Sequence, residues 1–490
     1  MTAGALLMST LAAPLIGAVL IVLCRKSPNL RETMTLATSV VLFALVVSLY
    51  MDVESLSSQR VVLVQMLPEL DLALCVEPLG MLFALLASFL WIVTSVYAIG
   101  YMRGHGESNQ TRFYVCFAIA IASVMGIAFA ANMVTLFVFY EVLTLSTYPL
   151  VTHSGTPEAR RAGKVYLGLL LGTSIGLQLV AIIWTWTITG TLEFTPGGVF
   201  AEQVSGGVLA VLTVLYVLGV GKAAVMPVHR WLPNAMVAPT PVSALLHAVA
   251  VVKAGVFTIL KVSVYIFGLD ALSMDGVRDL PLYLAGATVL LSSLVAMRQN
   301  NLKARLAYST VGQLSYVVVG ALLANELAVI GSGMHLFMHG FAKITLFFCA
   351  GAILVAAHKT EVSQLDGLGK TMPFTMAAFF VAALSVVGLP PTGGAWSKWF
   401  LVLGTLEAQQ STLLVVLMLS SLLNVSYLMS IPIRAFFRNS QSDGEEPKPA
   451  DIKEAPWACL LAIGVTTSGC VALFLYPTWL HQLLLRIFEG

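Results

Sequence analysis

The sequence predicts an all-α polytopic membrane protein with about 14 transmembrane helices. Of its 490 residues, 58% are hydrophobic and 10% are charged, whereas soluble domains carry roughly 25% charged residues. The mean hydropathy is +0.90. Apolar stretches long enough to cross a bilayer, about 20 residues, recur along the whole chain, and the loops between them alternate in charge. These three observations together favour a membrane-embedded helical bundle over a soluble domain.

The candidate spans follow one another with short connections. In chain order they are residues 4–24, 31–51, 79–102, 111–131, 133–152, 163–189, 207–226, 241–266, 280–297, 304–323, 328–357, 373–405, 412–437 and 454–477. The first has no basic residue before it, and Arg25 and Lys26 follow it, so we interpret it as a retained span and not as a cleaved signal peptide.

The loop charges support this count. Loops after odd-numbered spans carry arginine and lysine, including Arg25, Arg103, Arg160, Arg298 and Arg434. Loops after even-numbered spans carry mainly acids, including Asp71, Glu77, Glu193 and Asp270. Basic residues favour cytoplasmic loops, which predicts that both termini lie on the outer side. The longest polar stretch, Arg438 to Glu454, is then a cytoplasmic loop.

Composition also excludes several functions. The net charge of +2 comes from scattered residues and contains no basic run, so a nucleic-acid partner is not expected. The six cysteines are dispersed without CxxC spacing or a Cys/His cluster. We therefore expect no metal site, no cofactor and no redox centre in this chain.

Five ionisable residues lie well inside the predicted spans: one acid, Glu141, and the lysines Lys222, Lys253, Lys343 and Lys398. Such a group costs at least about 2.5 to 3.5 kcal/mol at the bilayer centre on insertion scales. One lysine can snorkel to an interface or form a static ion pair, but four lysines cannot all be paired by one acid. A further lysine, Lys261, is placed near the outer end of its helix.

Histidines extend this pattern. His335, His339 and Lys343 are spaced i, i+4 and i+8, which puts them on one face of a helix. Ser243 and His247 form another i, i+4 pair shortly before Lys253. A single such histidine is usually a satisfied core residue, whereas a His-His-Lys stripe at membrane depth indicates a hydrogen-bonded or water-lined track along which protons can move.

Prolines interrupt two of the spans. Lys222 is followed by Pro227, and Lys398 is preceded by Pro390 and Pro391 in GLPPTGGAWSKWF. Proline in a helix interior removes a backbone hydrogen bond, so we expect broken helices, although simple kinks are the alternative. After the first break, His229 to Ala238 are expected to form a short crossing on the cytoplasmic side.

The positions of the two breaks predict an internal repeat. Lys222 and Lys398 lie five spans apart, which predicts two inverted five-helix repeats. The predicted units are 1–110 (helices 1–3), 111–268 (helices 4–8), 269–437 (helices 9–13) and 438–490 (loop and helix 14).

These residues resemble the antiporter-like membrane subunits shared by respiratory complex I, membrane-bound hydrogenases and Mrp-type multisubunit cation/proton antiporters. The resemblance covers about Phe83 to Phe437 and is densest around the seventh span and in three other segments. It is carried by Phe139, Tyr140, Glu141, Lys222, Pro227, His229, Trp231, Leu232, Pro233, Ala235, Pro239, Thr240, Pro241, Val242, Ser243, Leu246, His247, Ala248, Arg305, Ala307, Tyr308, Ser309, Ser315, His335, His339, Lys343, Phe347 and Gly351.

The resemblance implies an ion pair between Glu141 and Lys222, a lateral path continuing through His247 and Lys253, and a bridge through His335, His339 and Lys343 to Lys398. The chain departs from the family at Ala395, where phenylalanine is common, which leaves the packing around that break undetermined. In length it looks most similar to the Mrp D-type subunit. The implied location is a bacterial or archaeal plasma membrane, and the implied partners are other membrane subunits, including homologous ones.

We therefore expect a proton-translocating subunit of an ion-pumping or Na⁺/H⁺ antiporter complex. One alternative is a scaffold subunit of a redox-driven complex whose buried charges conduct passively. Another is a stand-alone secondary transporter. The sequence leaves open the parent complex, the direction of pumping, and whether Na⁺, K⁺ or only H⁺ is moved; any redox enzyme activity would reside in other subunits.

Overall fold

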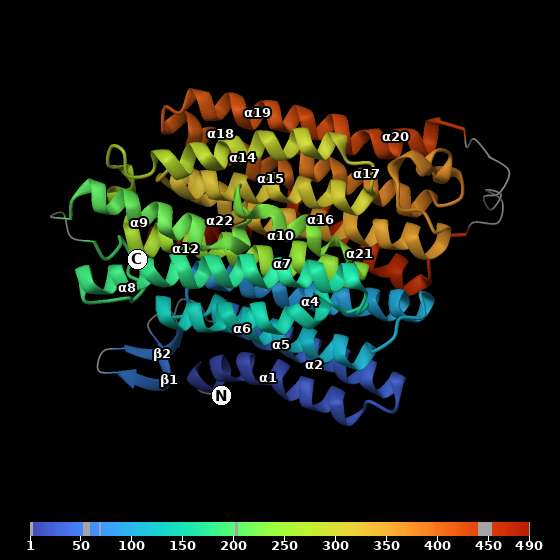
Figure 1. Ribbon diagram of the computed structural model, residues 1–490, viewed down its shortest axis with the longest axis horizontal. Coiled ribbons are helices and arrows are strands. Elements are labelled where there is room, and N and C mark those ends of the chain that lie inside the picture. The colour runs from blue at the N-terminus through green and yellow to red at the C-terminus, as the bar shows by residue number, and fades with distance from the viewer. Residues whose placement is uncertain (1–2, 52–58, 68–69, 201–203, 440–452, 490) are drawn as a thin grey trace.

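The computed structural model describes residues 3–51, 59–67, 70–200, 204–439 and 453–489. Most of the predicted cytoplasmic loop from Arg438 to Glu454 lies outside the described residues. The helices run nearly parallel along the long axis of the molecule, from the N-terminal helices on one flank to α19 and α20 on the other (Figure 1). This arrangement is the predicted all-α bundle.

The N-terminal half contains helices and one hairpin. Its elements are α1 (Ala3–Leu23), α2 (Pro28–Met51), β1 (Arg60–Leu67), β2 (Leu70–Cys75), α4 (Pro78–Gly104), α5 (Gln110–Ala128), α6 (Met133–Val151), α7 (Pro157–Thr173), η1 (Ser174–Gln178), α8 (Leu179–Thr189) and α9 (Gly206–Gly219). The antiparallel pair of β1 and β2, with Arg60 opposite Cys75, was not predicted from the sequence.

The C-terminal half begins in the broken region after α9. Its elements are η2 (Gly221–Ala223), η3 (Val228–Arg230), α10 (Trp231–Asn234), η4 (Ala235–Val237), α11 (Thr240–Ala244), η5 (Leu245–Val249), α12 (Val251–Val262), η6 (Ser263–Phe267), α13 (Gly268–Ser273), α14 (Asp279–Arg298), α15 (Leu302–Leu322), α16 (Glu326–Ala357), η7 (Val362–Leu365), η8 (Leu368–Lys370), α17 (Pro373–Val387), α18 (Gly394–Glu407), α19 (Ser411–Asn424), η9 (Val425–Met429), α20 (Ser430–Phe437), α21 (Trp457–Leu475) and α22 (Thr478–Leu485).

Eleven helical runs in the described part of the chain are long and apolar enough to cross a membrane. The helix α15, and the shorter helices α9 and α17 of the two broken spans, overlap the remaining predicted spans. The count of fourteen stays a prediction.

Asparagine caps begin three of the helices that carry site residues. The side chains of Asn132, Asn301 and Asn325 accept hydrogen bonds from the backbone at the starts of α6, α15 and α16. Such a cap satisfies a backbone donor that has no partner within the helix. These starts fix the register of the helices, and therefore the depth at which their polar side chains lie.

The helices differ in burial. Every residue of α12 is buried, and α16 is buried along most of its length, whereas α1, α14 and α19 expose apolar side chains such as Leu23, Leu291 and Leu422. Exposed apolar faces are expected where a membrane protein meets lipid or a neighbouring subunit. The lysines and histidines of α12 and α16 are buried and therefore face protein and not lipid.

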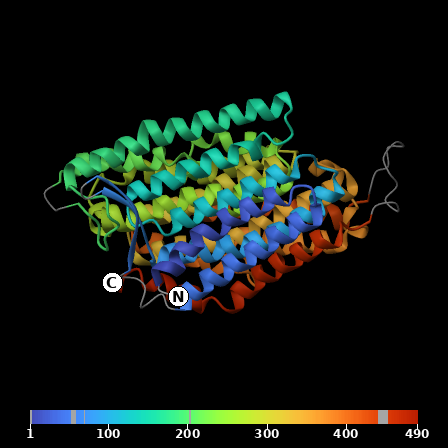
Figure 2. The same cartoon turned by 90° about the horizontal axis from the view of Figure 1, so that it is seen from below.

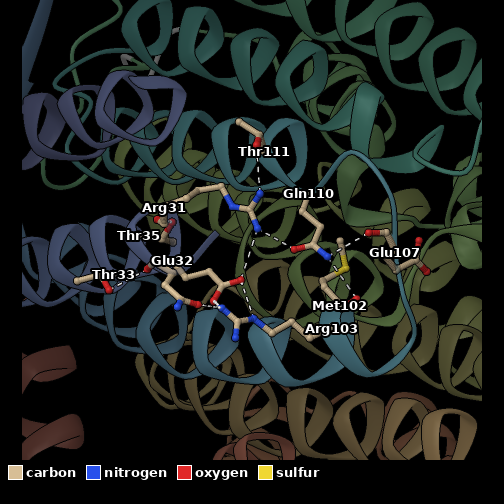
Figure 3. A network of polar contacts seen from close by, with 10 residues as sticks. Arg31, Glu32, Thr33, Thr35, Met102, Arg103, Glu107, Gln110 and Thr111 are labelled. Carbon is tan, nitrogen blue, oxygen red and sulfur yellow. Dashed lines mark hydrogen bonds and ion pairs between the residues drawn. The ribbon is translucent and has the colours of Figure 1, made fainter. Parts of the chain in front are cut away.

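An ion-pair network ties α2, α4 and α5 together at one end of the bundle (Figure 3). Arg31 donates to Gln110 and Thr111, at 2.7 and 3.2 Å, while Glu32 accepts two hydrogen bonds from Arg103. Two arginines that the sequence placed in cytoplasmic loops thus clamp the helix ends. Both chain ends lie at the opposite end, near the hairpin (Figures 1 and 2).

Candidate functional site

The first break places Lys222 inside the protein. The helix α9 ends at Gly219, and Lys222 lies in the short helical turn that follows, fully buried. Its ammonium donates to the carbonyl of Tyr140 at 2.8 Å and to the hydroxyl of Thr144 at 2.6 Å, both on α6. The Tyr140 ring centroid lies 3.1 Å from the same nitrogen. Lys222 is therefore held against α6 by three contacts.

The break itself is stabilised by side chains from other helices. The indole of Trp231 donates to the carbonyl of Gly221 at 2.9 Å, and the hydroxyl of Thr288 accepts from the amide of Met226 at 3.1 Å. Pro227 lies in the non-helical part of this region. The following residues, expected to form a short crossing, form the helical segment 228–237, in which Trp231 and Leu232 are buried.

Glu141 follows Tyr140 on α6 but makes a different set of contacts. Both of its carboxylate oxygens are buried and have no hydrogen-bond partner among the described residues. On the same face, one turn later, Leu145 is 57% exposed, so Glu141 lies close to the outer surface of the bundle. Lys222 thus packs against the stretch of α6 that carries Glu141, with its hydrogen bonds going to the Tyr140 carbonyl and the Thr144 hydroxyl.

The broken segment touches α12 at a glycine. A Cβ atom added to Gly255 would lie 2.3 Å from the backbone nitrogen of Ala223 and 2.4 Å from the carbonyl carbon of Lys222. Only glycine permits backbones to approach this closely. Because Lys253 is two residues earlier on α12, this contact holds the backbones that carry Lys222 and Lys253 side by side.

A row of polar contacts begins at Lys253. Its ammonium lies 2.8 Å from Nδ1 of His339 on α16. The His339 ring stacks on that of His335, with centroids 5.6 Å apart, and Nδ1 of His335 lies 2.9 Å from the hydroxyl of Ser397. Ser397 immediately precedes Lys398 on α18. The two histidines of the predicted stripe thus lie between Lys253 and Ser397, the residue before Lys398.

The second break surrounds Lys398. The helix α17 ends at Val387, and residues 388–393, which include Pro390 and Pro391, separate it from α18. The Lys398 ammonium donates to the carbonyl of Val387 at 3.0 Å and to the hydroxyl of Ser421 at 2.9 Å. Helix ends leave such carbonyls without intrahelical partners, so Lys398 satisfies an acceptor that the break exposes.

Lys343 and His247, like Glu141 and Lys222, lie outside this row. The Lys343 ammonium donates to the hydroxyl of Ser309 at 2.7 Å and to the carbonyl of Leu306 at 3.2 Å, both on α15. His247 lies in η5 with its ring 4.6 Å from that of Phe347, and neither ring nitrogen has a hydrogen-bond partner among the described residues. The hydroxyl of Ser243 bonds the carbonyl of Pro239 and not His247.

The two broken-helix lysines have matching surroundings. The Lys398 ammonium lies 4.7 Å from the ring centroid of Tyr316 on α15, as Lys222 lies over Tyr140 on α6. In the predicted repeat, each tyrosine is two spans before its lysine. The two broken helices also enter from opposite ends of the bundle, since α9 and α17 lie at opposite ends in Figure 1. One difference is that Glu141 follows the first tyrosine whereas Val317 follows the second.

Sequence reasoning missed one buried pair. The ammonium of Lys261, which is fully buried, lies 2.5 Å from a carboxylate oxygen of Glu77. Glu77 was counted among the loop acids because it precedes Pro78 at the start of a span. The available signal was a lysine eight residues after Lys253 in a wholly apolar run, which places both on one face of α12.

Comparisons with known proteins identify the family. The family described as NADH:quinone oxidoreductase/Mrp antiporter, TM, matches residues 130–424. The chain belongs to this family. All eight predicted ionisable site residues, from Glu141 to Lys398, lie within the matched range of the NADH:quinone oxidoreductase/Mrp antiporter family, and Glu77 lies before it.

Individual members of the family show how far the similarity extends. NADH-quinone oxidoreductase subunit N of Desulforudis audaxviator is 32% identical over 420 residues, which is 84% of this chain and 83% of that protein. The D-type Na(+)/H(+) antiporter subunit of Alkalihalophilus pseudofirmus is 29% identical over 74% of this chain and 73% of its own length. NAD(P)H-quinone oxidoreductase chain 5 of Synechocystis is 30% identical, and the chain spans 49% of its length.

A solved structure shares the fold. A chain of the Mrp complex from Dietzia sp. DQ12-45-1b matches with a TM-score of 0.86 and 22% identity, over 100% of this chain and 97% of its own. The expected resemblance and fold class are thereby confirmed. The protein is an antiporter-like integral membrane subunit of the NADH:quinone oxidoreductase/Mrp antiporter family.

Proposed function

We propose that this chain translocates protons within a multisubunit ion-pumping or cation/proton antiporter complex of the plasma membrane. The observation that carries the proposal is the row formed by Lys253, His339, His335 and Ser397, which leads through a hydrogen bond, a ring stack and a second hydrogen bond to the residue before Lys398. Neutral imidazole is both a donor and an acceptor, so each ring can receive a proton on one nitrogen and release one from the other.

Two of the predicted site residues, Glu141 and Lys398, lie near exposed faces of the bundle. Glu141 lies near the exposed face of α6, and a cavity of about 350 Å³ lies beside Lys398, next to the exposed side chains of Trp399 and Met418. In Figure 1, α6 lies in the lower half of the bundle and α19 at its upper edge. This geometry supports lateral transfer between neighbouring membrane subunits, which are the expected partners because the solved relative belongs to a complex.

Glu141 is the proposed switch. A unit-charge pair at 4 Å is worth about 4 kcal/mol at an effective dielectric of 20, which is enough to determine whether Lys222 holds its proton. The contacts of Lys222 with Tyr140 and Thr144 compete with that pair. A signal from a neighbouring subunit that draws Lys222 toward Glu141 would hold the proton, and the reverse movement would release it toward Lys253.

The orientation forms part of the proposal. Basic residues mark the end of the bundle at which α2 begins as cytoplasmic, and both chain ends lie at the other end (Figure 1). We therefore assign both termini to the outer side. Na⁺ or K⁺ as the counter-ion stays an open alternative to H⁺ alone.

The experiment is reconstitution of the native complex with His339→Gln, with His358→Asn as the control. Loss of the central imidazole interrupts the row, and we expect coupled transport to fall by about 100-fold. His358 is exposed at the end of the same helix, in a left-handed conformation that asparagine tolerates. Unchanged transport by an assembled His339→Gln complex would contradict the proposal.

A scaffold role is the second candidate. The observation that favours it is that Lys343 and Lys398 each bond a backbone carbonyl and a serine hydroxyl, which is also what a purely structural lysine would do. Under the scaffold function, Lys343→Ala and Lys398→Ala weaken assembly, and the complex that does assemble transports at the normal rate. Under the proposed function, assembled complexes with either substitution are slow.

A further inference from the structure

A cavity of about 580 Å³ opens at the end of the bundle that carries the hairpin and both chain ends. We call it the vestibule. It is lined by residues of six separate regions: the hairpin, the start of α4, the connection between α5 and α6, the segment after α8, η6, and the C-terminal residues after α22. Its lining includes Arg60, Cys75, Glu77, Ala130, Glu193 and Tyr265.

The deepest charged group of the vestibule is a buried ion pair. Glu77, whose side chain is 15% exposed, lies 2.5 Å from the fully buried ammonium of Lys261. Lys261 also donates to the carbonyl of Ala130 at 2.7 Å and lies 4.2 Å from the ring centroid of Phe194. Glu77 therefore lines the vestibule, and Lys261 lies on α12 in the interior of the protein.

The interior side leads toward the proton row. Lys253, Phe257 and Lys261 are spaced i, i+4 and i+8, so they lie on one face of α12. The Phe257 ring packs on that of Phe83, with centroids 4.9 Å apart, and both are fully buried. Phe257 also lies 5.7 Å from the Lys261 ammonium. An aromatic pair thus separates the two lysines.

We propose that the Glu77–Lys261 pair is a proton-exchange site between the vestibule and the buried row, and that Phe257 and Phe83 form the barrier between Lys261 and Lys253. The proposal rests on the proposed function, because it supplies that function with a route to one side of the membrane. The ligand of the site is the proton itself, delivered to or taken from water in the vestibule.

The exchange is balanced in protons and charge. A proton transferred from Nζ of Lys261 to a carboxylate oxygen of Glu77 converts the ion pair into a neutral amine and a neutral carboxylic acid. The acid then releases this proton to water, which regenerates the carboxylate and forms hydronium. The amine takes its next proton from the row across the aromatic barrier, and the reverse sequence imports protons.

Both positively and negatively charged side chains surround the Glu77–Lys261 pair in the vestibule. Arg60 of β1 forms ion pairs with Asp71 and Glu193, the latter at 2.8 Å. The remaining titratable groups that line the cavity are Cys75, Tyr265, Arg486 and Glu489. Burial raises the pKa of the Cys75 thiol, and the Glu77 carboxylate raises it further.

The first test separates proton exchange from static pairing. Glu77→Gln is expected to slow transport by the reconstituted complex about 100-fold, whereas Glu326→Gln, at the start of α16 and away from the vestibule lining, leaves it near wild type. Replacing both members of a buried ion pair is often neutral for stability. The Glu77→Gln/Lys261→Met double variant therefore assembles but stays slow; recovery of transport in that variant overturns the proposal.

The second test does not depend on transport. Complexes that retain Cys75, with the other five cysteines replaced by serine, are treated with a membrane-impermeant maleimide from the outer side. Because the Cys75 pKa is raised, labelling is expected to accelerate as the pH rises through the alkaline range. Glu77→Gln removes one cause of that rise, so it speeds labelling at fixed pH. Absence of labelling, or no effect of Glu77→Gln, rejects the vestibule even if the proposed function holds.

The third test examines the barrier. Phe257→Ser is expected to let a pH gradient across proteoliposomes collapse without the coupled ion, while Phe267→Ser does not, because Phe267 packs on Tyr216 and Phe200 away from the stripe. If proteoliposomes that contain the Phe257→Ser complex hold their pH gradient, the proposed aromatic barrier is wrong. Normal labelling of Cys75 with no transport defect in any variant of the row would instead reject the proposed function and leave the vestibule in place.

Discussion

Two tyrosines hold the broken-helix lysines, and they do so at different distances. The ring centroid of Tyr140 lies 3.1 Å from the Lys222 ammonium, and that of Tyr316 lies 4.7 Å from the Lys398 ammonium. A desolvated ammonium gains about 2 kcal/mol or more from an aromatic face. The closer contact is therefore expected to contribute more to holding the charge.

We predict that Tyr140→Leu lowers coupled transport roughly tenfold, as expected for losing most of a cation–π contact, whereas Tyr140→Phe has a small effect. The phenylalanine keeps the ring and loses only the hydroxyl that accepts from the Lys222 amide at 3.2 Å. Ion flux in proteoliposomes gives the rates. Tyr316→Leu is the matched comparison and should be milder; an equal loss with Phe and Leu at position 140 would show that the hydroxyl and not the ring matters.

Residue positions were the part of the site that the sequence predicted best. Ionisable side chains in apolar runs stand out by composition alone, and the i, i+4 spacing placed His335 and His339 on one face of α16. Partners were harder to predict, because periodicity says nothing about contacts between helices. The bond between Lys253 and His339 joins residues 86 apart, and the pair of Glu77 and Lys261 joins two helices whose order in space no spacing reveals.

At the scale of elements, the contact of η2 with α12 depends on Gly255. We predict that Gly255→Ala destabilises the protein by about 1 to 3 kcal/mol, the usual cost of overpacking, because the added carbon would lie 2.3 Å from the backbone nitrogen of Ala223. The midpoint of thermal unfolding in detergent measures the change.

The matched control is Gly172→Ala. Gly172 is also a helical glycine, on α7, and an added Cβ would meet nothing within 4 Å. Alanine has the higher helix propensity, so this variant should be as stable as wild type or more so. A Gly255→Ala protein as stable as Gly172→Ala would show that the two segments separate readily.

The breaks were predictable as elements because proline cannot continue a helix, and Pro390 and Pro391 do lie in the non-helical residues 388–393. The hairpin was not predicted, since its valine and leucine residues fall between spans where only a polar loop was expected. The helical form of the segment 228–237 was not predicted either, and its buried Trp231 and Leu232 make it part of the bundle.

At the scale of the whole molecule, both chain ends lie at the vestibule end of the bundle (Figure 2). We predict that epitope tags at the N-terminus and at the C-terminus are both removed by protease added to right-side-out vesicles, and that both are protected in inverted vesicles. Immunoblotting of each tag measures this. Opposite behaviour of the two tags would contradict an even number of spans, and protection of both in right-side-out vesicles would invert the orientation.

Two helices that carry buried ionisable residues are more enclosed than several other helices of similar hydropathy. The apolar spans α1 and α19 expose much of their surface, while α12 and α16, which carry Lys253, Lys343 and two of the predicted histidines, are largely enclosed. A hydropathy profile ranks all of these as similar spans, which is why the sequence predicted an all-helical bundle but not which helices form its centre. Burying a charge is costly unless protein groups satisfy it, and the central helices provide those groups.

The difference between Glu141 and Val317 gives the molecule a polarity. Each broken-helix lysine has a tyrosine beside it, but only the first tyrosine is followed by an acid. A positive charge arriving near α6 can draw on Glu141 and alter Lys222, whereas the same charge arriving near Lys398 finds a valine at the equivalent place. If the proposed function holds, neighbouring subunits of this kind would receive a disturbance at the Glu141 side and pass it on from the Lys398 side, which would give transfer between subunits a direction.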